Sequence, residues 1–220
     1  MSLNYYPAFI NLREKQCVVV GGGKVAERKV LTLIRSGAKV KVISPAITGI
    51  LERYKQEGRI RHIKRNYKKG DLNDAFLVIA ATSDEEINRR VSGEAPFLVN
   101  AVDMPEMANF IVPSVINRGL LTIAISTSGA SPAIAKAIRK ELEMLYGREF
   151  GQFLFYMKSL RGRAMKEISD KRIREGFLKG IASEEIFELL RKKGFRSARK
   201  KVGNNFAMTE VSLKKRGKDL

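Results

Sequence analysis

The sequence predicts an α/β fold: an N-terminal parallel β-sheet with helices, a central β-hairpin followed by a helix, and a C-terminal helical domain. Apolar strand-like runs alternate with helix-like segments over roughly the first 100 residues, which is typical of a parallel sheet covered on both faces. Two β-rich runs separated by a short glycine turn come next, as in a hairpin. Helical spacing then dominates. We therefore place the domains at residues 1–112, 113–147 and 148–220.

The N-terminal domain begins with an apolar strand at residues 17–20, which ends at a run of three glycines. Residues 24–37 place apolar side chains at helical spacing, and Gly37 is a typical stop. Ser83 or Asp84 is a suitable cap for a later helix. The other predicted elements of this domain are strands at 39–43, 59–64, 76–82 and 97–102 and helices at 46–57 and 84–92.

The central and C-terminal parts have a different pattern. Residues 110–116 and 120–127 are β-rich and are separated by Asn117-Arg118-Gly119, which predicts a hairpin. A helix is expected over 131–147, with Ser131 as N-cap, Pro132 in the first turn and Gly147 as its stop. Two or three helices should cover 149–193, and the basic segment 195–220 is expected to be a partly disordered tail.

Composition excludes several classes of protein. One cysteine and one histidine exclude a disulfide framework, a cysteine-based zinc site and a histidine-cluster metal site, so we expect no bound metal. No apolar run reaches about 18 residues, so no membrane span is expected. The N-terminus lacks a basic start followed by an apolar stretch. We therefore expect a cytoplasmic protein without a signal peptide.

The charge is strongly positive, with 42 basic and 23 acidic side chains and a net charge of +19. Residues 152–220 alone carry 19 basic and 8 acidic side chains. Such a field attracts polyanions: nucleic acid, an acidic membrane, or a small ligand with many carboxylates. Charge by itself does not choose among these partners.

A glycine motif follows the first strand and opens the first helix, as Gly21-x-Gly23-x-x-Ala26. In a Rossmann-like fold such glycines allow a tight turn and bring the backbone close to a pyrophosphate, so the motif predicts dinucleotide binding. The usual acid at the end of the second strand is missing, and Ser44 stands there instead. Ribose contacts should then come from backbone, Ser44 or water, and the strand end does not distinguish NAD from NADP.

Three further loops follow strands and are candidate ligand contacts. The first pairs Thr82 with Asn88, the second runs from Asn100 to Asp103, and the third is the hydroxyl-rich segment Ser126, Thr127 and Ser128 before a capped helix. Asp103 could accept a proton at the rim of the sheet. Each loop also has a purely structural interpretation: a capped β–α loop, a turn aspartate, and ordinary helix capping. His62 and Cys17 are interpreted as structural residues.

The order of these motifs resembles the siroheme synthase family, and within it the precorrin-2 dehydrogenase/sirohydrochlorin ferrochelatase module. The resemblance rests on YYPAFINLREKQCVVVGGGKVAERKV, AATSDEEINRRV and VNAVDMPEMANFIVPSVINRGLLTIAISTSGASPAIAKAIRKELE. It covers about residues 3–147 closely and the later helices loosely. Few other dinucleotide-binding sequences combine these three segments.

The resemblance implies NAD-dependent oxidation of precorrin-2 to sirohydrochlorin, in a homodimer formed through residues 113–147. It assigns the key aspartate to Asp103. From their place in the loops after strands, we expect Asn100 and the loop 126–128 to contact the substrate. Some members carry a serine where this chain has Thr127, so phosphorylation there is not expected. No methyltransferase module follows, so we expect the unfused form. The implied cofactor positions are Gly22, Gly23, Lys24, Val25, Ser44, Pro45 and Ala46, to which the residue patterns add Gly21, Thr82 and Asn88.

Alternatives to this activity stay open at this point. The enzyme could also insert Fe2+ into sirohydrochlorin, because removal of pyrrole protons needs a base such as Asp103. A different hypothesis is a non-enzymatic nucleotide-sensing module whose basic tail binds nucleic acid. The loop that carries Asp103 and the segment at 126–132 favour the enzyme, so neither nucleic acid nor membrane is the expected partner.

Overall fold

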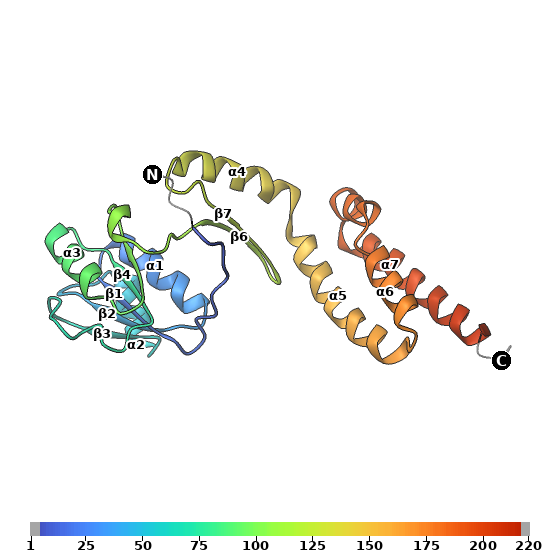
Figure 1. The fold of residues 1–220 in the computed structure, drawn as a ribbon, viewed down its shortest axis with the longest axis horizontal. Coiled ribbons are helices and arrows are strands. Elements are labelled where there is room, and N and C mark those ends of the chain that lie inside the picture. Colours follow the sequence, from blue (N-terminus) through green and yellow to red (C-terminus); the bar gives the residue numbers. More distant parts are fainter. Residues whose placement is uncertain (1–4, 217–220) are drawn as a thin grey trace. The chain divides into compact units, whose positions relative to one another are not determined.

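The computed structural model describes residues 5–216 and divides the chain into two compact units, with the boundary between Val112 and Pro113 (Figure 1). The first unit contains a parallel sheet with its helices. The second contains a hairpin and four helices. Each unit is described by itself.

The first unit is built on a five-stranded parallel sheet with the strand order β3-β2-β1-β4-β5, which confirms the predicted fold class. The order reverses beside β1, because the chain crosses from β3 on one side to β4 on the other. In open α/β sheets this reversal point, at the carboxyl ends of the strands, is where ligands bind. The strands are β1 (Gln16–Val20), β2 (Lys39–Ile43), β3 (Ile60–Ile63), β4 (Leu77–Ala80) and β5 (Leu98–Ala101).

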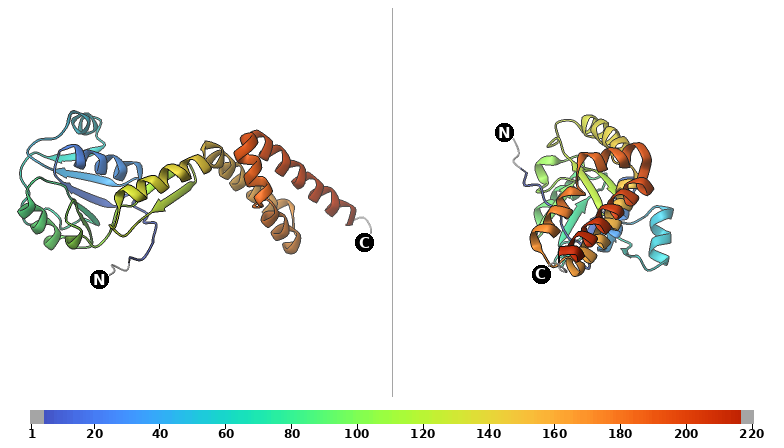
Figure 2. Two further views of the ribbon diagram at one scale, coloured as in Figure 1. Left: turned by 90° about the horizontal axis from the view of Figure 1, so that it is seen from above. Right: turned by 90° about the vertical axis from the view of Figure 1, so that its right-hand side faces the viewer.

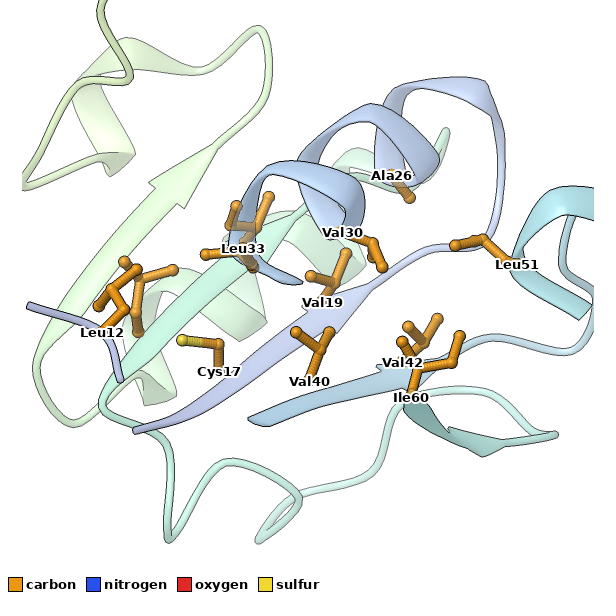
Figure 3. Close-up of a cluster of buried hydrophobic side chains, with 12 residues drawn as sticks. Leu12, Cys17, Val19, Ala26, Val30, Leu33, Val40, Val42, Leu51 and Ile60 are labelled. Atoms are coloured by element: carbon orange, nitrogen blue, oxygen red, sulfur yellow. The ribbon is translucent and has the colours of Figure 1, made fainter. Parts of the chain in front are cut away.

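Both faces of this sheet are buried, because alternate residues of β1 enter two separate cores. Cys17 and Val19 face α1 (Lys24–Arg35) and α2 (Gly49–Gln56), where they pack with Val30 and Leu51 (Figure 3). Val18 and Val20 face the opposite side, which is covered by α3 (Glu85–Glu94). A strand buried on both faces explains the continuous apolar runs in the sequence.

Two helices of the first unit begin where a side chain caps them. Asp84 accepts a hydrogen bond from the Ile87 amide at 3.1 Å, which confirms one of the two predicted caps of α3. Thr48 caps α2 in the same way, so this helix starts three residues later than predicted. The residues 44–48 are thereby left as a loop beside the end of β2. A short 3-10 turn, η1 (Pro105–Met107), follows β5.

The second unit contains an antiparallel hairpin of β6 (Ser114–Arg118) and β7 (Leu121–Ile125), with α4 (Pro132–Leu145) packed against it (Figure 2). The hairpin was predicted, but the predicted strand bounds were wrong. Residues 110–113 do not join the first strand, since Pro113 has no amide hydrogen to donate. The turn falls at Gly119-Leu120, where Gly119 adopts a left-handed φ of 67°.

Helices α5 (Arg148–Glu167), α6 (Lys171–Gly180) and α7 (Glu184–Arg216) complete the second unit. The sequence analysis predicted that Gly147 ends α4, and this prediction was wrong. Helix α4 ends at Leu145 with Tyr146 as its C-cap, and Gly147 is the residue from which α5 begins. Two residues therefore separate the two helices, and the glycine is the N-cap of the second one.

The basic segment after residue 195 is helical up to Arg216, which corrects the prediction of a disordered tail. Helix α7 breaks at Gly194, which has a φ of 73°, and the second part of the helix turns back so that Lys201 pairs with Glu185. Ala198, Val202 and Phe206 are buried at four-residue spacing among the lysines. Burial of this narrow apolar stripe stabilises the helix, which the basic composition of the segment does not predict. The last four predicted tail residues, 217–220, lie outside the described residues.

Within residues 5–216, none of the helices combines the length and the apolar character needed to cross a bilayer.

Candidate functional site

A cavity of about 460 Å³ opens at the carboxyl ends of β1, β2 and β4, where the strand order reverses. Its floor is the glycine turn after β1, and its walls are the loops that follow β2, β3 and β4. The lining residues are Val20, Gly21, Gly22, Gly23, Ile43, Ser44, Pro45, Asn66, Tyr67, Ala81, Thr82, Ser83, Asp84 and Ile87.

The three glycines of the turn differ in what surrounds them. Gly21 has a φ of 122°, and a Cβ atom there would lie 2.2 Å from the Ala81 carbonyl oxygen. At Gly22 a Cβ atom would lie 1.9 Å from the Ala46 carbonyl oxygen. At Gly23 a Cβ atom would meet no protein atom within 4 Å. The first two glycines are required by the packing of the protein itself, and the third faces open space.

Helix α1 starts directly after this turn, so its N-terminus lies beside the cavity. Gly23 is its N-cap and supplies no side-chain hydrogen bond, so the amides of the first turn are free to bind a ligand. Helix N-termini attract anions, because their amides and their dipole are positive. Together with the open space above Gly23, this arrangement fits the diphosphate of a dinucleotide.

The wall beyond β2 is polar and neutral. Ser44 is buried, and its backbone carbonyl lies 2.9 Å from Nε2 of His62, which supports the structural interpretation of that histidine. Among the described residues, no lysine or arginine lines the cavity. The neighbouring Arg65 is engaged in two hydrogen bonds of 2.7 Å with the Asp71 carboxylate. A cation for an additional phosphate is therefore missing from this wall.

The loop between β4 and α3 is held by Asn88, which is buried behind the cavity wall. Its Oδ1 accepts a hydrogen bond from the Thr82 amide at 3.2 Å and lies 2.8 Å from the Thr82 hydroxyl. Its Nδ2 donates to the Thr82 carbonyl at 3.0 Å. Asn88 thus fixes the loop, whereas Thr82 lines the cavity.

Asp103 lies exposed in the turn after β5, outside the lining of the cavity. Its φ of 62° is in the left-handed region, which aspartate tolerates better than most residues. Its carboxylate interacts electrostatically with Lys29 of α1. The pKa of Lys29 is lowered, mainly because the ammonium group is partly buried, and Asp103 acts in the opposite direction. A carboxylate and an amine therefore lie at the same rim of the sheet.

The side chains predicted to contact the substrate form hydrogen bonds within their own units. Asn100 donates from Nδ2 to the Phe110 carbonyl at 3.1 Å. In the second unit, the Thr127 hydroxyl donates to the Ser131 carbonyl at 3.1 Å, and the Ser126 hydroxyl accepts from the Ser128 amide at 3.0 Å. These bonds shape the loop before α4.

Six of the predicted cofactor residues line one cavity: Gly21, Gly22, Gly23, Ser44, Pro45 and Thr82. Four others lie outside its lining: Lys24, Val25, Ala46 and Asn88. The sequence analysis missed Asn66, Tyr67 and Ile87, and it considered Asp84 only as a helix cap. Asn66 and Tyr67 were detectable, because they follow the third strand as Ser44 follows the second, and all parallel strands end at the same edge.

Across residues 5–216 there is no group of three or more His, Cys, Asp and Glu side chains arranged to hold a metal ion.

Comparisons with known proteins agree with this geometry. A family described as "Putative NAD(P)-binding" matches residues 8–114, and a family described as "Sirohaem biosynthesis protein central" matches residues 118–145. Among solved structures, "SirC, precorrin-2 dehydrogenase" has the same fold, with a TM-score of 0.77 and 24% identity over 91% of this chain and 100% of that one.

Relatives of known sequence match most of the chain. The siroheme synthase of Methylobacillus flagellatus is 38% identical over 187 residues, which are 82% of this chain and 40% of the relative. That of Thioalkalivibrio sulfidiphilus is 36% identical over 190 residues, 85% of this chain and 39% of the relative. The chain thus spans about 40% of the length of these curated relatives. Both family models match consecutive segments, so the chain carries an NAD(P)-binding domain followed by a sirohaem biosynthesis central domain, and it is similar to siroheme synthases over more than four fifths of its length.

Proposed function

We propose that this chain oxidises precorrin-2 to sirohydrochlorin with NAD+ as the hydride acceptor. The observation that carries the proposal is the glycine cradle: a turn packed too closely for side chains on one side and open toward a cavity on the other. Relatives named siroheme synthase and a similar fold named precorrin-2 dehydrogenase support the choice of reaction.

The residues of the cavity fit a dinucleotide. Bound NAD+ supplies the acceptor for a hydride, and the protein supplies position and electrostatics. Gly22 and Gly23, with the first turn of α1, would hold the diphosphate, and Ser44 and Pro45 would contact the ribose. Oxidation of the macrocycle removes a hydride, which passes to NAD+, and a proton, for which the Asp103 carboxylate is the acceptor at the rim.

The substrate of this reaction is a macrocycle with many carboxylates. A net charge of +19 attracts such a polyanion and raises its local concentration. We assign Asn100 and the loop 126–128 to the binding of these carboxylates, together with arginine and lysine side chains that the sequence does not single out. The charge therefore serves the substrate, whereas the cavity that holds the cofactor is nearly neutral.

The protein should prefer NAD+ to NADP+. No lysine or arginine lines the cavity in the described residues, and Arg65 is held by Asp71, so an additional 2′-phosphate would be desolvated without a partner. We expect NADP+ to bind at least about tenfold more weakly, which is the cost of roughly one unpaired polar contact. Titration calorimetry with both nucleotides measures this ratio. Equal affinities would contradict the assignment of this wall to the ribose.

A homodimer formed through residues 113–147 is the proposed assembly. Apolar side chains are exposed on α4 and the hairpin, among them Ile134 at 56%, Leu145 at 46% and Val115 at 43%. A second copy would cover this apolar surface, which is stabilising. Ile134→Glu should convert a dimer to a monomer in light scattering, whereas Lys136→Glu, on the opposite side of the helix, should not. A wild-type monomer at micromolar concentration would refute the assembly.

Anaerobic incubation with precorrin-2 tests the activity. We expect sirohydrochlorin to form when NAD+ is present and not when it is omitted. Repeating the assay with Fe2+ tests the second candidate, a bifunctional enzyme that also inserts iron, because Asp103 is an exposed carboxylate that can take pyrrole protons. No sirohydrochlorin with NAD+ would refute the dehydrogenase. The nucleotide-sensing alternative predicts salt-sensitive binding of nucleic acid instead.

A further inference from the structure

A buried carboxylate lies beside the glycine turn, and the proposed reaction does not use it. Glu27 is in the first turn of α1, and its side chain is only 8% exposed. A buried charge is costly unless it is hydrogen-bonded. Two groups contact the Glu27 carboxylate: the hydroxyl of Thr48, which donates a short hydrogen bond, and the ammonium of Lys24 at 3.4 Å. The pKa of Glu27 is lowered, chiefly by the hydrogen bond from Thr48.

Thr48 joins this carboxylate to the loop that follows β2. Its backbone amide donates to the Gly22 carbonyl at 3.1 Å, and its hydroxyl accepts from the Leu51 amide at 3.4 Å. The hydroxyl hydrogen is then directed to Glu27. One residue thus connects the glycine turn, the start of α1 and the start of α2.

The two loops that meet here form the floor of the cavity and one of its walls. The glycine turn carries Gly22 and Gly23, and the loop 44–48 carries Ser44 and Pro45. They touch so closely that a Cβ atom on Gly22 would lie 1.9 Å from the Ala46 carbonyl oxygen. Glu27 and Thr48 themselves lie outside the cavity lining. The contacts of Glu27 and Thr48 therefore affect the cavity only through the glycine turn and the loop 44–48.

From these contacts we infer that Glu27 and Thr48 are positioning residues that hold the loop 44–48 against the glycine turn in the geometry needed by the adenosine half of NAD+. The inference rests on the proposed use of this cavity for NAD+. It also gives a physical role to an acid in a chain whose second strand lacks the usual ribose-binding acid. Here a carboxylate acts from behind the loop, where it fixes the backbone that contacts the ribose.

Substitutions at the two positions test this role by direct binding of NAD+ and of AMP. Thr48→Val removes the hydroxyl at nearly constant volume, and Glu27→Gln removes the charge. Each should weaken both ligands about five- to tenfold, the scale of one charge-assisted hydrogen bond. Thr48→Ser restores the hydroxyl and should bind within about twofold of the wild type. Glu52→Gln, at a partly exposed glutamate of α2 that pairs with Lys55, is the matched control and should bind normally.

Kinetics separate positioning from a merely structural role. In Glu27→Gln and Thr48→Val the KM for NAD+ should rise while kcat at saturating NAD+ stays near that of the wild type, because a displaced loop is restored by the bound ligand. A loss of folded protein would lower kcat instead. Hydrogen exchange of residues 44–48 should be faster in Glu27→Gln, a variant of unchanged size that remains informative when Thr48→Val does not fold.

Wild-type protein that does not bind NAD+ would refute the proposed function itself. If the wild type binds but Glu27→Gln and Thr48→Val bind NAD+ within about twofold of it, with unchanged exchange in 44–48, the positioning role is wrong and the cofactor site stands.

Discussion

Replacing Asp103 with alanine is expected to lower the turnover of precorrin-2 at least about 100-fold, the low end of what a positioned acid or base contributes. The carboxylate lies at the carboxyl rim of the sheet, in the turn after β5, and outside the cavity assigned to NAD+. Binding of NAD+ should therefore be unchanged. Initial rates of sirohydrochlorin formation and calorimetric titration with NAD+ measure the two quantities.

A second substitution controls for the backbone of this turn. Asp103 has a φ of 62°, which alanine adopts at a cost of about 1 kcal/mol and asparagine adopts more readily. Asp103→Asn should therefore fold as the wild type and lose activity as alanine does, because the amide cannot accept the proton. Asp74→Ala, a change in an exposed turn, should remain active. Near-normal turnover in Asp103→Asn would remove this carboxylate from the mechanism.

Gly21→Ala should be a strongly destabilising substitution in the cofactor site. Gly21 has a φ of 122°, which alanine rarely adopts. The Cβ atom of an alanine there would lie 2.2 Å from the carbonyl oxygen of Ala81, in the loop after β4. Strain and overpacking of this kind each cost about 1–3 kcal/mol. We expect a loss of about 3 kcal/mol in the free energy of unfolding. Urea denaturation followed by circular dichroism measures it.

Gly23→Ala is the matched control for this prediction, because the added methyl meets no protein atom within 4 Å. Its stability should stay within about 0.5 kcal/mol of the wild type. Its affinity for NAD+ should fall at least about tenfold, because the methyl would occupy the space that the diphosphate needs. Unchanged affinity in Gly23→Ala would show that the diphosphate lies elsewhere, and unchanged stability in Gly21→Ala would contradict the packing of the turn.

The sheet and the position of the cavity were predictable because they depend on local patterns. An apolar strand, a glycine turn and an amphipathic helix lie next to one another in the sequence, and the rule that parallel strands end at one edge places Ser44 and Thr82 beside the turn. The same rule reaches Asn66 and Tyr67, which the motif-centred analysis left aside. The role of Glu27 was not predictable in detail, since it depends on a contact with Thr48, which lies 21 residues away in the sequence.

The C-terminal helices show why composition alone misleads. Residues 195–216 are rich in lysine and arginine, and the average hides one apolar side chain every four residues. Ala198, Val202 and Phe206 form the inner stripe of a helix whose other faces are charged. Tertiary packing of that stripe stabilises the helix. Removing the segment would therefore expose a hydrophobic core, and substitutions of exposed lysines are the better probe of its charge.

The account depends most on direct transfer of a hydride from the macrocycle to NAD+. This transfer can be tested by converting one batch of precorrin-2 under strictly anaerobic conditions. NADH and sirohydrochlorin are both quantified by absorbance in the same cuvette. We predict one NADH for each sirohydrochlorin formed, at all times during the reaction. Sirohydrochlorin appearing without a matching amount of NADH would mean that the electrons leave by another route, and the proposed chemistry would be wrong.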